Sequence, residues 1–143
     1  LGASCDETDP QPVVWPACGE IDIMEYVGQN PATVFGTVHG PGYSGGDGIG
    51  KEYTLTNDRF DTGFHVFGIE WTSEYINWYV DGDLYNQITR EEIEEQGSWV
   101  FDNPFYIILN VAVGGNLPGP PNEETVFPQS MFVDYVRVYQ END

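Results

Sequence analysis

Three carboxylates lie within one short run of the chain that otherwise favours a buried β-strand. Glu20, Asp22 and Glu25 stand among the isoleucine, methionine, tyrosine and valine residues of positions 19–27. Such β-branched and apolar residues are typical of a strand that packs against a core. An unpaired ionised carboxylate in an apolar setting costs several kcal/mol, so a purely structural strand would exclude these acids. The run therefore predicts a strand that lines a solvated, functional cleft.

The spacing of the acids predicts a β-bulge within that strand. With strict alternation Glu20 and Asp22 share a face, but Met24 rather than Glu25 comes next on it. A bulge at Ile23 and Met24 puts two residues in one pleat and returns Glu25 to the face of the other acids. The two glutamate carboxyls would then lie about 5–6 Å apart. Retaining glycosidases need about 5–5.5 Å and inverting ones about 6.5–9.5 Å, so the spacing favours retaining chemistry.

The amino-acid composition favours one loop-rich domain built from many strands. The 143 residues include 17 Gly and 10 Pro, and aromatic residues make up 15% of the chain and can fill a core. Only one short segment has helical patterning. We therefore expect a single all-β domain.

The charge of the chain excludes two classes of partner. The sequence has 24 acidic and 4 basic side chains, a formal net charge of −20. Nucleic acids and anionic membranes are recognised through basic patches that release counterions, and this chain has no such patch. A neutral ligand fits the composition better. We attribute most of the acid excess to solubility or to adaptation to salt, which would screen the self-repulsion.

Two cysteines, Cys5 and Cys18, flank a proline-rich loop that leads into the acidic run. A disulfide between them would hold the loop beside the acids, and free thiols are an equal alternative at this stage. The sequence shows no secretory signal, transmembrane run or lipidation motif. Because residue 1 is a leucine and not a methionine, we expect that an upstream segment was removed.

Alternating apolar residues and turn signals place the expected elements. Asp81-Gly82 is the strongest turn signal, because these residues accept the positive φ values of a tight hairpin. Thr89 and Glu92 have the spacing of a capping box, which predicts a short helix after the hairpin. Residues 105–113 are the most hydrophobic run and predict a central strand. Further strands are expected at residues 33–39, 51–55, 64–71, 75–80, 84–88 and 131–139.

Four further side chains are candidates for ligand or metal binding. Trp15, just before the acidic run, could stack on a sugar ring or fill the core. His39, at the end of the next strand, could bond an acid or a sugar hydroxyl, or serve structure alone. Asn110 interrupts the most hydrophobic run and must find partners in the core or at a cleft. Asp134 interrupts an apolar face and needs a hydrogen-bond network, a nearby arginine or a calcium ion.

The acidic run and its surroundings resemble a known family. Residues 15–28, WPACGEIDIMEYVG, are similar to the signature of the laminarinase-like branch of glycoside hydrolase family 16. The resemblance implies a concanavalin A-like β-jelly-roll sandwich of two antiparallel sheets, with a substrate cleft across the concave sheet. It also implies endo-hydrolysis of β-1,3-glucans such as laminarin with retention of configuration. It continues through residues 36–40, 64–71, 78–82, 108–116 and 133–139 and covers essentially the whole chain.

The resemblance also implies roles for the acids, and no cofactor for catalysis. Glu20 matches the family's nucleophile, Asp22 the assisting acid and Glu25 the general acid/base. Met24 matches the extra residue of the bulged motif. The chemistry fits these roles, because Glu20 must be ionised to attack the anomeric carbon while Glu25 must be protonated to donate to the leaving oxygen. Neighbouring negative charge would raise the pKa of Glu25 toward that task.

Outside the acids, the family resemblance implies a sugar-stacking role for Trp15 and a position in the cleft for His39. Asn110 is expected to bind substrate, because Gly-Gly-Asn follows shortly after it. Asp134 matches a strand position that in many relatives helps to bind a structural calcium on the convex face. The chain departs from the family at Leu117, where relatives often have an aromatic residue.

The resemblance also predicts how much of the domain is present. Catalytic domains of this type run to about 200–250 residues, so we expect residues 1–143 to be the C-terminal portion of a single domain, incomplete at its N-terminus. Its partners would be a β-glucan polysaccharide and the missing N-terminal segment, in a secreted, extracellular monomer. Two alternative functions are a mixed-linkage β-1,3-1,4-glucanase and a non-catalytic β-glucan-binding module. Such binding modules usually lack the acids that this chain retains.

Overall fold

The computed structural model describes residues 1–5, 8, 10–11 and 13–140 of the protein. It divides into two compact units, Leu1–Ile108 and Leu109–Asp143.

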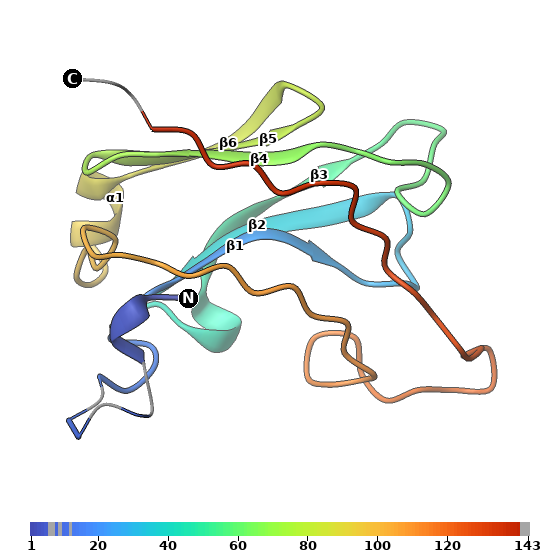
Figure 1. Ribbon diagram of the computed structural model, residues 1–143, viewed down its shortest axis with the longest axis horizontal. Helices are drawn as coiled ribbons and strands as arrows, with labels where there is room; N and C mark the ends of the chain where they lie inside the picture. The colour runs from blue at the N-terminus through green and yellow to red at the C-terminus, as the bar shows by residue number, and fades with distance from the viewer. Residues whose placement is uncertain (6–7, 9, 12, 141–143) are drawn as a thin grey trace. The chain divides into compact units, whose positions relative to one another are not determined.

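The first unit contains two three-stranded antiparallel sheets, which appear as separate layers of ribbon in Figure 1. One sheet has the strand order β1-β2-β3 and the other β4-β5-β6. The predicted all-β fold with two antiparallel sheets is therefore confirmed. The elements are η1 Ala3–Cys5, β1 Glu20–Tyr26, β2 Thr33–His39, η2 Gly45–Asp47, β3 Ile49–Thr54, β4 Phe67–Trp71, β5 Tyr75–Val80, β6 Asp83–Thr89 and α1 Arg90–Glu94.

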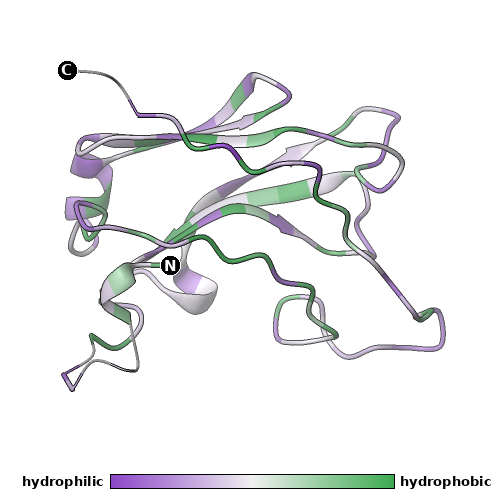
Figure 2. Cartoon of the chain, in the orientation of Figure 1, coloured by the Kyte–Doolittle hydropathy of each residue, from purple (hydrophilic) through white to green (hydrophobic). Residues whose placement is uncertain are grey.

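Apolar side chains from both sheets form the core of the first unit. On β5, Ile76, Trp78 and Val80 alternate toward the interior and are at most 1% exposed. Val38 of β2 packs in the same cluster as Ile76 and Trp78, and Val34 packs with Val80. Figure 2 shows the matching alternation of hydrophobic and hydrophilic colour along the strands. A period of two is typical of strands with one buried face, and it fixes which side chains are left for the other face.

The predicted hairpin turn and the predicted capping box are both confirmed. Asp81 and Gly82 have φ values of 51° and 92°, and they join β5 to β6. At the start of α1, the Thr89 side chain accepts a hydrogen bond from the Glu92 amide, and the Glu92 side chain accepts one from the Thr89 amide.

Among the described residues, no helix has the length and apolarity needed to cross a membrane.

The central strand expected at residues 105–113 is absent, so this prediction is wrong. Phe105 makes one isolated bridge with Gly2. Beyond Tyr106 the run belongs to no strand ladder, and Ile108 is 56% exposed. Hydrophobicity predicts burial, but a strand also needs a neighbour for its main-chain hydrogen bonds. Tyr106 exchanges main-chain hydrogen bonds with Leu1, but beyond Tyr106 the described residues supply no such neighbour.

The second unit contains no strand or helix among its described residues, 109–140. The closing strand expected at residues 131–139 is therefore also absent, for the same reason of missing strand partners. Within this segment the Arg137 guanidinium lies 4.1 Å from the centre of the Tyr135 ring. Val138 is 80% exposed. The described residues of the second unit thus present apolar side chains without a core of their own.

Candidate active site

The bulge predicted in the acidic run is present in β1. Asp22 lies opposite Thr37 of β2, whereas Glu25 lies opposite Phe35, so two residues of β1 face one residue of β2. Residues directly opposite each other in an antiparallel pair share a sheet face. The register shift therefore places Glu25 on the same face as Glu20 and Asp22.

β2 adds a histidine and a hydroxyl to this face. His39 lies opposite Glu20, and Thr37 lies opposite Asp22. Val38, between them in sequence, points the other way and is 0% exposed. The hydrophobic side of β2 thus anchors the strand in the core while its polar side completes the site.

Asp22 and His39 form a close pair. The Nε2 atom of His39 lies 3.3 Å from Oδ2 of Asp22, and their side chains are only 12% and 19% exposed. The interaction with the Asp22 carboxylate raises the pKa of His39 above its ordinary value, although burial acts against it. The ring packs against Gly48, where any side chain would collide with it. His39 is therefore held in place as a cationic partner for the acids over a widened pH range.

Glu25 is the acid whose protonated form the site favours. Burial raises the pKa of its carboxyl, and the nearby charge of Asp22 raises it further. A hydrogen bond of 3.3 Å from Thr37 Oγ1 to Glu25 Oε2 works in the opposite direction, as does the charge of His39. The balance is a carboxyl that keeps its proton to a higher pH than an exposed glutamate does.

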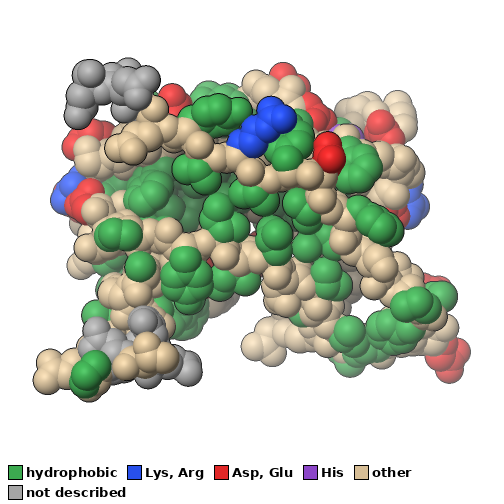
Figure 3. All heavy atoms as spheres, in the orientation of Figure 1, with side chains coloured by type: hydrophobic (Ala, Val, Ile, Leu, Met, Phe, Trp, Pro, Cys, Tyr) green, Lys and Arg blue, Asp and Glu red, His purple; other side chains and the backbone are tan. Residues whose placement is uncertain are grey.

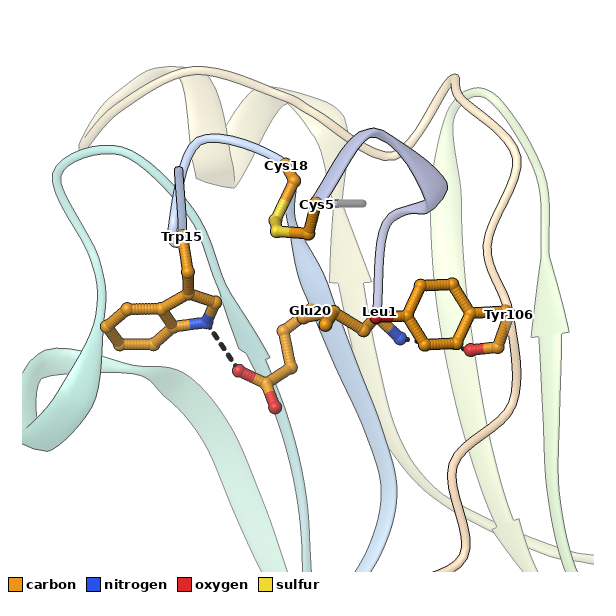
Figure 4. Close-up of a disulfide and its surroundings, with 6 residues drawn as sticks. All are labelled: Leu1, Cys5, Trp15, Cys18, Glu20 and Tyr106. Carbon is orange, nitrogen blue, oxygen red and sulfur yellow. Dashed lines mark hydrogen bonds between the residues drawn. A yellow bond between two sulfur atoms is a disulfide. The ribbon is translucent and has the colours of Figure 1, made fainter. Parts of the chain in front are cut away.

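Trp15 lies over the acids and is 42% exposed, so it does not fill the core. Its indole Nε1 donates a hydrogen bond of 2.6 Å to Oε2 of Glu20, as Figure 4 shows. The centres of the Trp15 and His39 rings are 6.0 Å apart. The indole therefore fixes the Glu20 carboxylate while it leaves much of its own surface open to a ligand.

A disulfide joins Cys5 to Cys18 and settles the alternative that the sequence left open (Figure 4). The two Cα atoms are 5.5 Å apart, and Cys18 is 1% exposed. The adjacent backbone is also tied down, because the Gly2 amide donates to the Gly19 carbonyl over 2.8 Å. The bridge therefore anchors the loop that carries Trp15 directly before β1.

Asn110 and Asp134 belong to the second unit, and both are exposed. Their predicted roles in substrate and calcium binding stay predictions. Calcium takes about six to eight oxygen ligands. Among the described residues, the group of three acidic, histidine or cysteine side chains that could hold a metal is Glu20, Asp22 and His39, not a group at Asp134.

Thr37 was not predicted as part of the site. Its signal is present in the sequence, because Thr37 and His39 alternate along one strand and must share a face. What the sequence does not give is the register between the strands, which brings Thr37 opposite Asp22 and within reach of Glu25.

Together, the two sheets and the acid-bearing face define a β-sandwich protein with a site of three carboxylates and one histidine. Residues 8–136 match the model of the glycosyl hydrolases family 16. The chain belongs to this family.

Solved structures with this fold share much of the sequence. The endo-β-1,3-glucanase from Pyrococcus furiosus is 54% identical with a TM-score of 0.83, over 90% of this chain and 48% of that one. The laminarinase catalytic domain from Thermotoga maritima is 52% identical with a TM-score of 0.82, over 89% and 50%. A β-glucanase from Rhodothermus marinus is 44% identical over 88% of this chain and 46% of its own. The chain thus spans about half the length of these relatives.

Proposed function

We propose that the protein is a retaining endo-β-1,3-glucanase that acts on laminarin-type glucans. The observation that carries this proposal is the register shift in β1, which puts Glu25 on one face with Glu20 and Asp22. The names of the similar structures, an endo-β-1,3-glucanase and a laminarinase, support the same substrate class. The net charge of −20 also favours a neutral polysaccharide.

The reaction would proceed in two displacements. Glu20 attacks the anomeric carbon while Glu25 gives its proton to the leaving glycosidic oxygen, which forms a covalent glycosyl-enzyme. Glu25, now a carboxylate, then takes a proton from a water molecule while the water oxygen attacks the anomeric carbon. The bond between this carbon and Glu20 breaks, and Glu20 leaves as a carboxylate. Asp22 supports the protonated form of Glu25 through its charge and is itself paired with His39.

The position of Trp15 fits a sugar-stacking role beside the nucleophile. Its exposed ring can carry the apolar face of a glucose unit, while its N–H group holds the Glu20 carboxylate. The Nδ1 atom of His39 is buried, so a substrate hydroxyl would have to bond Nε2, the ring nitrogen that lies 3.3 Å from Oδ2 of Asp22. We place the enzyme outside the cell, because disulfides such as Cys5–Cys18 persist in oxidising surroundings.

We also propose that the working enzyme needs a further segment of the same domain. Many apolar side chains of the described residues are more than half exposed, and Figure 3 shows such hydrophobic side chains at the surface. Exposed apolar surface of this extent marks an interaction site. The described chain also spans about half the length of its similar relatives. The fuller domain is therefore the form to assay.

The direct test is the activity of a Glu20→Gln variant of the full-length protein on laminarin. Removing the nucleophile should lower kcat/KM by about 10³-fold or more, with little change in stability. Glu95→Gln is the matched control, because Glu95 is an exposed glutamate at the end of α1, outside the sheet that carries the three acids. The control should stay within about twofold of the wild type. Near-normal hydrolysis by the Glu20 variant would refute the proposal.

The roles of the two glutamates can be separated with azide and a dinitrophenyl β-glucoside. In Glu20→Ala, azide takes the place of the nucleophile and should give an α-glycosyl azide. In Glu25→Ala, azide attacks the covalent intermediate and should give the β-glycosyl azide. Identical products from both variants would contradict the assignment. Product lengths from laminarin and from lichenan would then distinguish β-1,3-glucanase from mixed-linkage activity.

A further inference from the structure

The acidic strand is held by a buried tryptophan from the opposite sheet. Trp78 of β5 is 0% exposed, and its indole Nε1 donates a hydrogen bond of 2.9 Å to the main-chain carbonyl of Asp22. Asp22 is the last residue of β1 that pairs regularly with β2 before the register shifts. The tryptophan therefore contacts β1 at the beginning of the bulge.

Trp78 reaches β1 through the space that Gly36 of β2 leaves opposite the bulge. Between the pairs Asp22–Thr37 and Glu25–Phe35, Gly36 of β2 faces two residues of β1, Ile23 and Met24. A Cβ atom at Gly36 would collide with the Trp78 indole and with the Tyr85 hydroxyl. Glycine at this position thus lets Trp78 pass β2 and reach the backbone of β1.

A second buried donor holds β2 at the same place. Asn86 of β6 is 1% exposed, and its Nδ2 atom donates a hydrogen bond of 3.2 Å to the Gly36 carbonyl. Asn86 lies directly opposite Trp78 in the pairing of β5 with β6. The two side chains are therefore one cross-strand pair, and they bond both strands that flank the bulge.

Two other indoles of the first unit, buried Trp99 and partly exposed Trp71, find partners elsewhere. Trp99 donates to the carboxylate of Asp102, and Trp71 donates to the Phe101 carbonyl. A buried tryptophan needs a partner for its N–H group, but this need alone does not direct the bond to the acidic strand. The position of the Trp78–Asn86 pair at the register shift is what distinguishes it.

We propose that Trp78 and Asn86 are positioning residues that hold the β1 bulge in the register which presents Glu25 to the substrate. This inference rests on the proposed hydrolase function. A slip of one residue in a strand turns the following side chains to the opposite face. Loss of the pair would therefore misplace Glu25, which follows the bulge. Glu20 precedes the bulge and is held separately by Trp15, so its position would be kept.

Because Glu25 should be displaced while Glu20 stays in place, a Trp78 variant of the full-length protein should lose activity mainly on substrates that need a proton from Glu25. Trp78→Phe removes the N–H donor and keeps an aromatic ring. On laminarin, whose leaving group needs a proton from Glu25, kcat/KM should fall about 10- to 100-fold. On a dinitrophenyl β-glucoside, whose leaving group needs no proton, kcat/KM should fall less than about threefold. Equal losses on both substrates, or no loss on either, would overturn the proposal.

Trp99→Phe is the matched control, because Trp99 is also buried in this core and donates its N–H to Asp102. The control should keep the ratio of the two activities, even if it loses as much stability as Trp78→Phe does. If Trp78→Phe does not fold, Trp78 can be replaced by 3-benzothienylalanine, which exchanges the N–H for sulfur in nearly the same shape. This isostere should also lower kcat/KM on laminarin more than on the dinitrophenyl β-glucoside. A ratio of the two activities equal to that of the wild type would overturn the proposal.

Hydrogen exchange tests the positioning role without reference to activity. The isostere should speed the exchange of the main-chain amides of residues 23–25 about tenfold or more, and leave those of α1 unchanged. Unchanged exchange at residues 23–25 would overturn the role of Trp78. If the wild-type protein hydrolyses neither substrate, the proposed function fails, and this measurement still decides whether Trp78 holds the bulge.

Discussion

The protonation of Glu25 depends on a small set of neighbouring side chains. Burial and the charge of Asp22 raise the pKa of its carboxyl, while the hydroxyl of Thr37 and the charge of His39 lower it. Thr37 donates to Glu25 from the strand face that also carries His39. A single hydroxyl therefore adjusts the pH at which the proposed general acid loses its proton.

Replacing Thr37 with valine removes that hydroxyl and keeps the shape of the side chain. Because the Thr37 hydrogen bond lowers the pKa of Glu25, its loss should raise this pKa further. The alkaline limb of the kcat/KM profile on laminarin, which reports loss of the Glu25 proton, should then move to higher pH. Thr33→Val on the same strand is the control, since Thr33 bonds Thr54 instead. A limb that stays in place or moves to lower pH would contradict this reading.

At the scale of elements, the site depends on supports outside β1 itself. The bulge faces Gly36 of β2 and is contacted by Trp78 of β5. The loop that precedes β1 is anchored by the Cys5–Cys18 disulfide and carries Trp15 to the Glu20 carboxylate. The acidic strand is thus held at its beginning by the disulfide-anchored loop and at its bulge by Trp78.

The disulfide should contribute strongly to stability. It closes a loop with a sequence separation of 13, for which the loss of unfolded-state entropy is worth about 3 kcal/mol. The double variant Cys5→Ser with Cys18→Ser should lower the free energy of unfolding by about this amount in urea titrations. Dithiothreitol should destabilise the wild type to the same degree and leave the double variant unaffected. Equal stability of the wild type and the double variant would show that the bridge does not restrain the fold.

At the scale of the whole molecule, negative charge is in large excess. The sequence has 24 acidic residues for 4 basic ones. Among the described residues, Arg59 pairs with Asp61, and Arg90 pairs with Glu94 and Asp102. Most of the acids therefore repel one another across the surface, and they do so more strongly in the compact state than in the unfolded chain.

Salt should therefore stabilise the protein. Raising the NaCl concentration from about 0.01 M to about 0.1 M shortens the screening length from about 30 Å to about 10 Å. With a net charge of −20, we expect a gain on the order of 1 kcal/mol. This gain corresponds to a rise of about 4 °C in Tm, measured by circular dichroism. KCl at the same ionic strength should give the same rise. A Tm that is constant or falls with salt would exclude charge repulsion as a limit on stability.

Local signals predicted much of the first unit. Asp81-Gly82 forms the hairpin turn, Thr89 and Glu92 cap α1, and the spacing from Asp22 to Glu25 gives the bulge. Each of these features depends on residues close together in the chain, so sequence patterns carry it. The expected strands at residues 105–113 and 131–139 are absent, because a strand also requires a partner that hydrophobicity does not specify.

The sequence by itself determined the identity of the acids, the bulge that places them on one face and the family to which the chain belongs. Only the tertiary structure decided what surrounds those acids. Trp15 over Glu20 and Trp78 behind Asp22 are contacts between elements, and they depend on the packing of a loop and a second sheet. The physical reason is that a carboxylate's pKa and position are set by neighbours distant in sequence, whereas the run that carries the carboxylates is local.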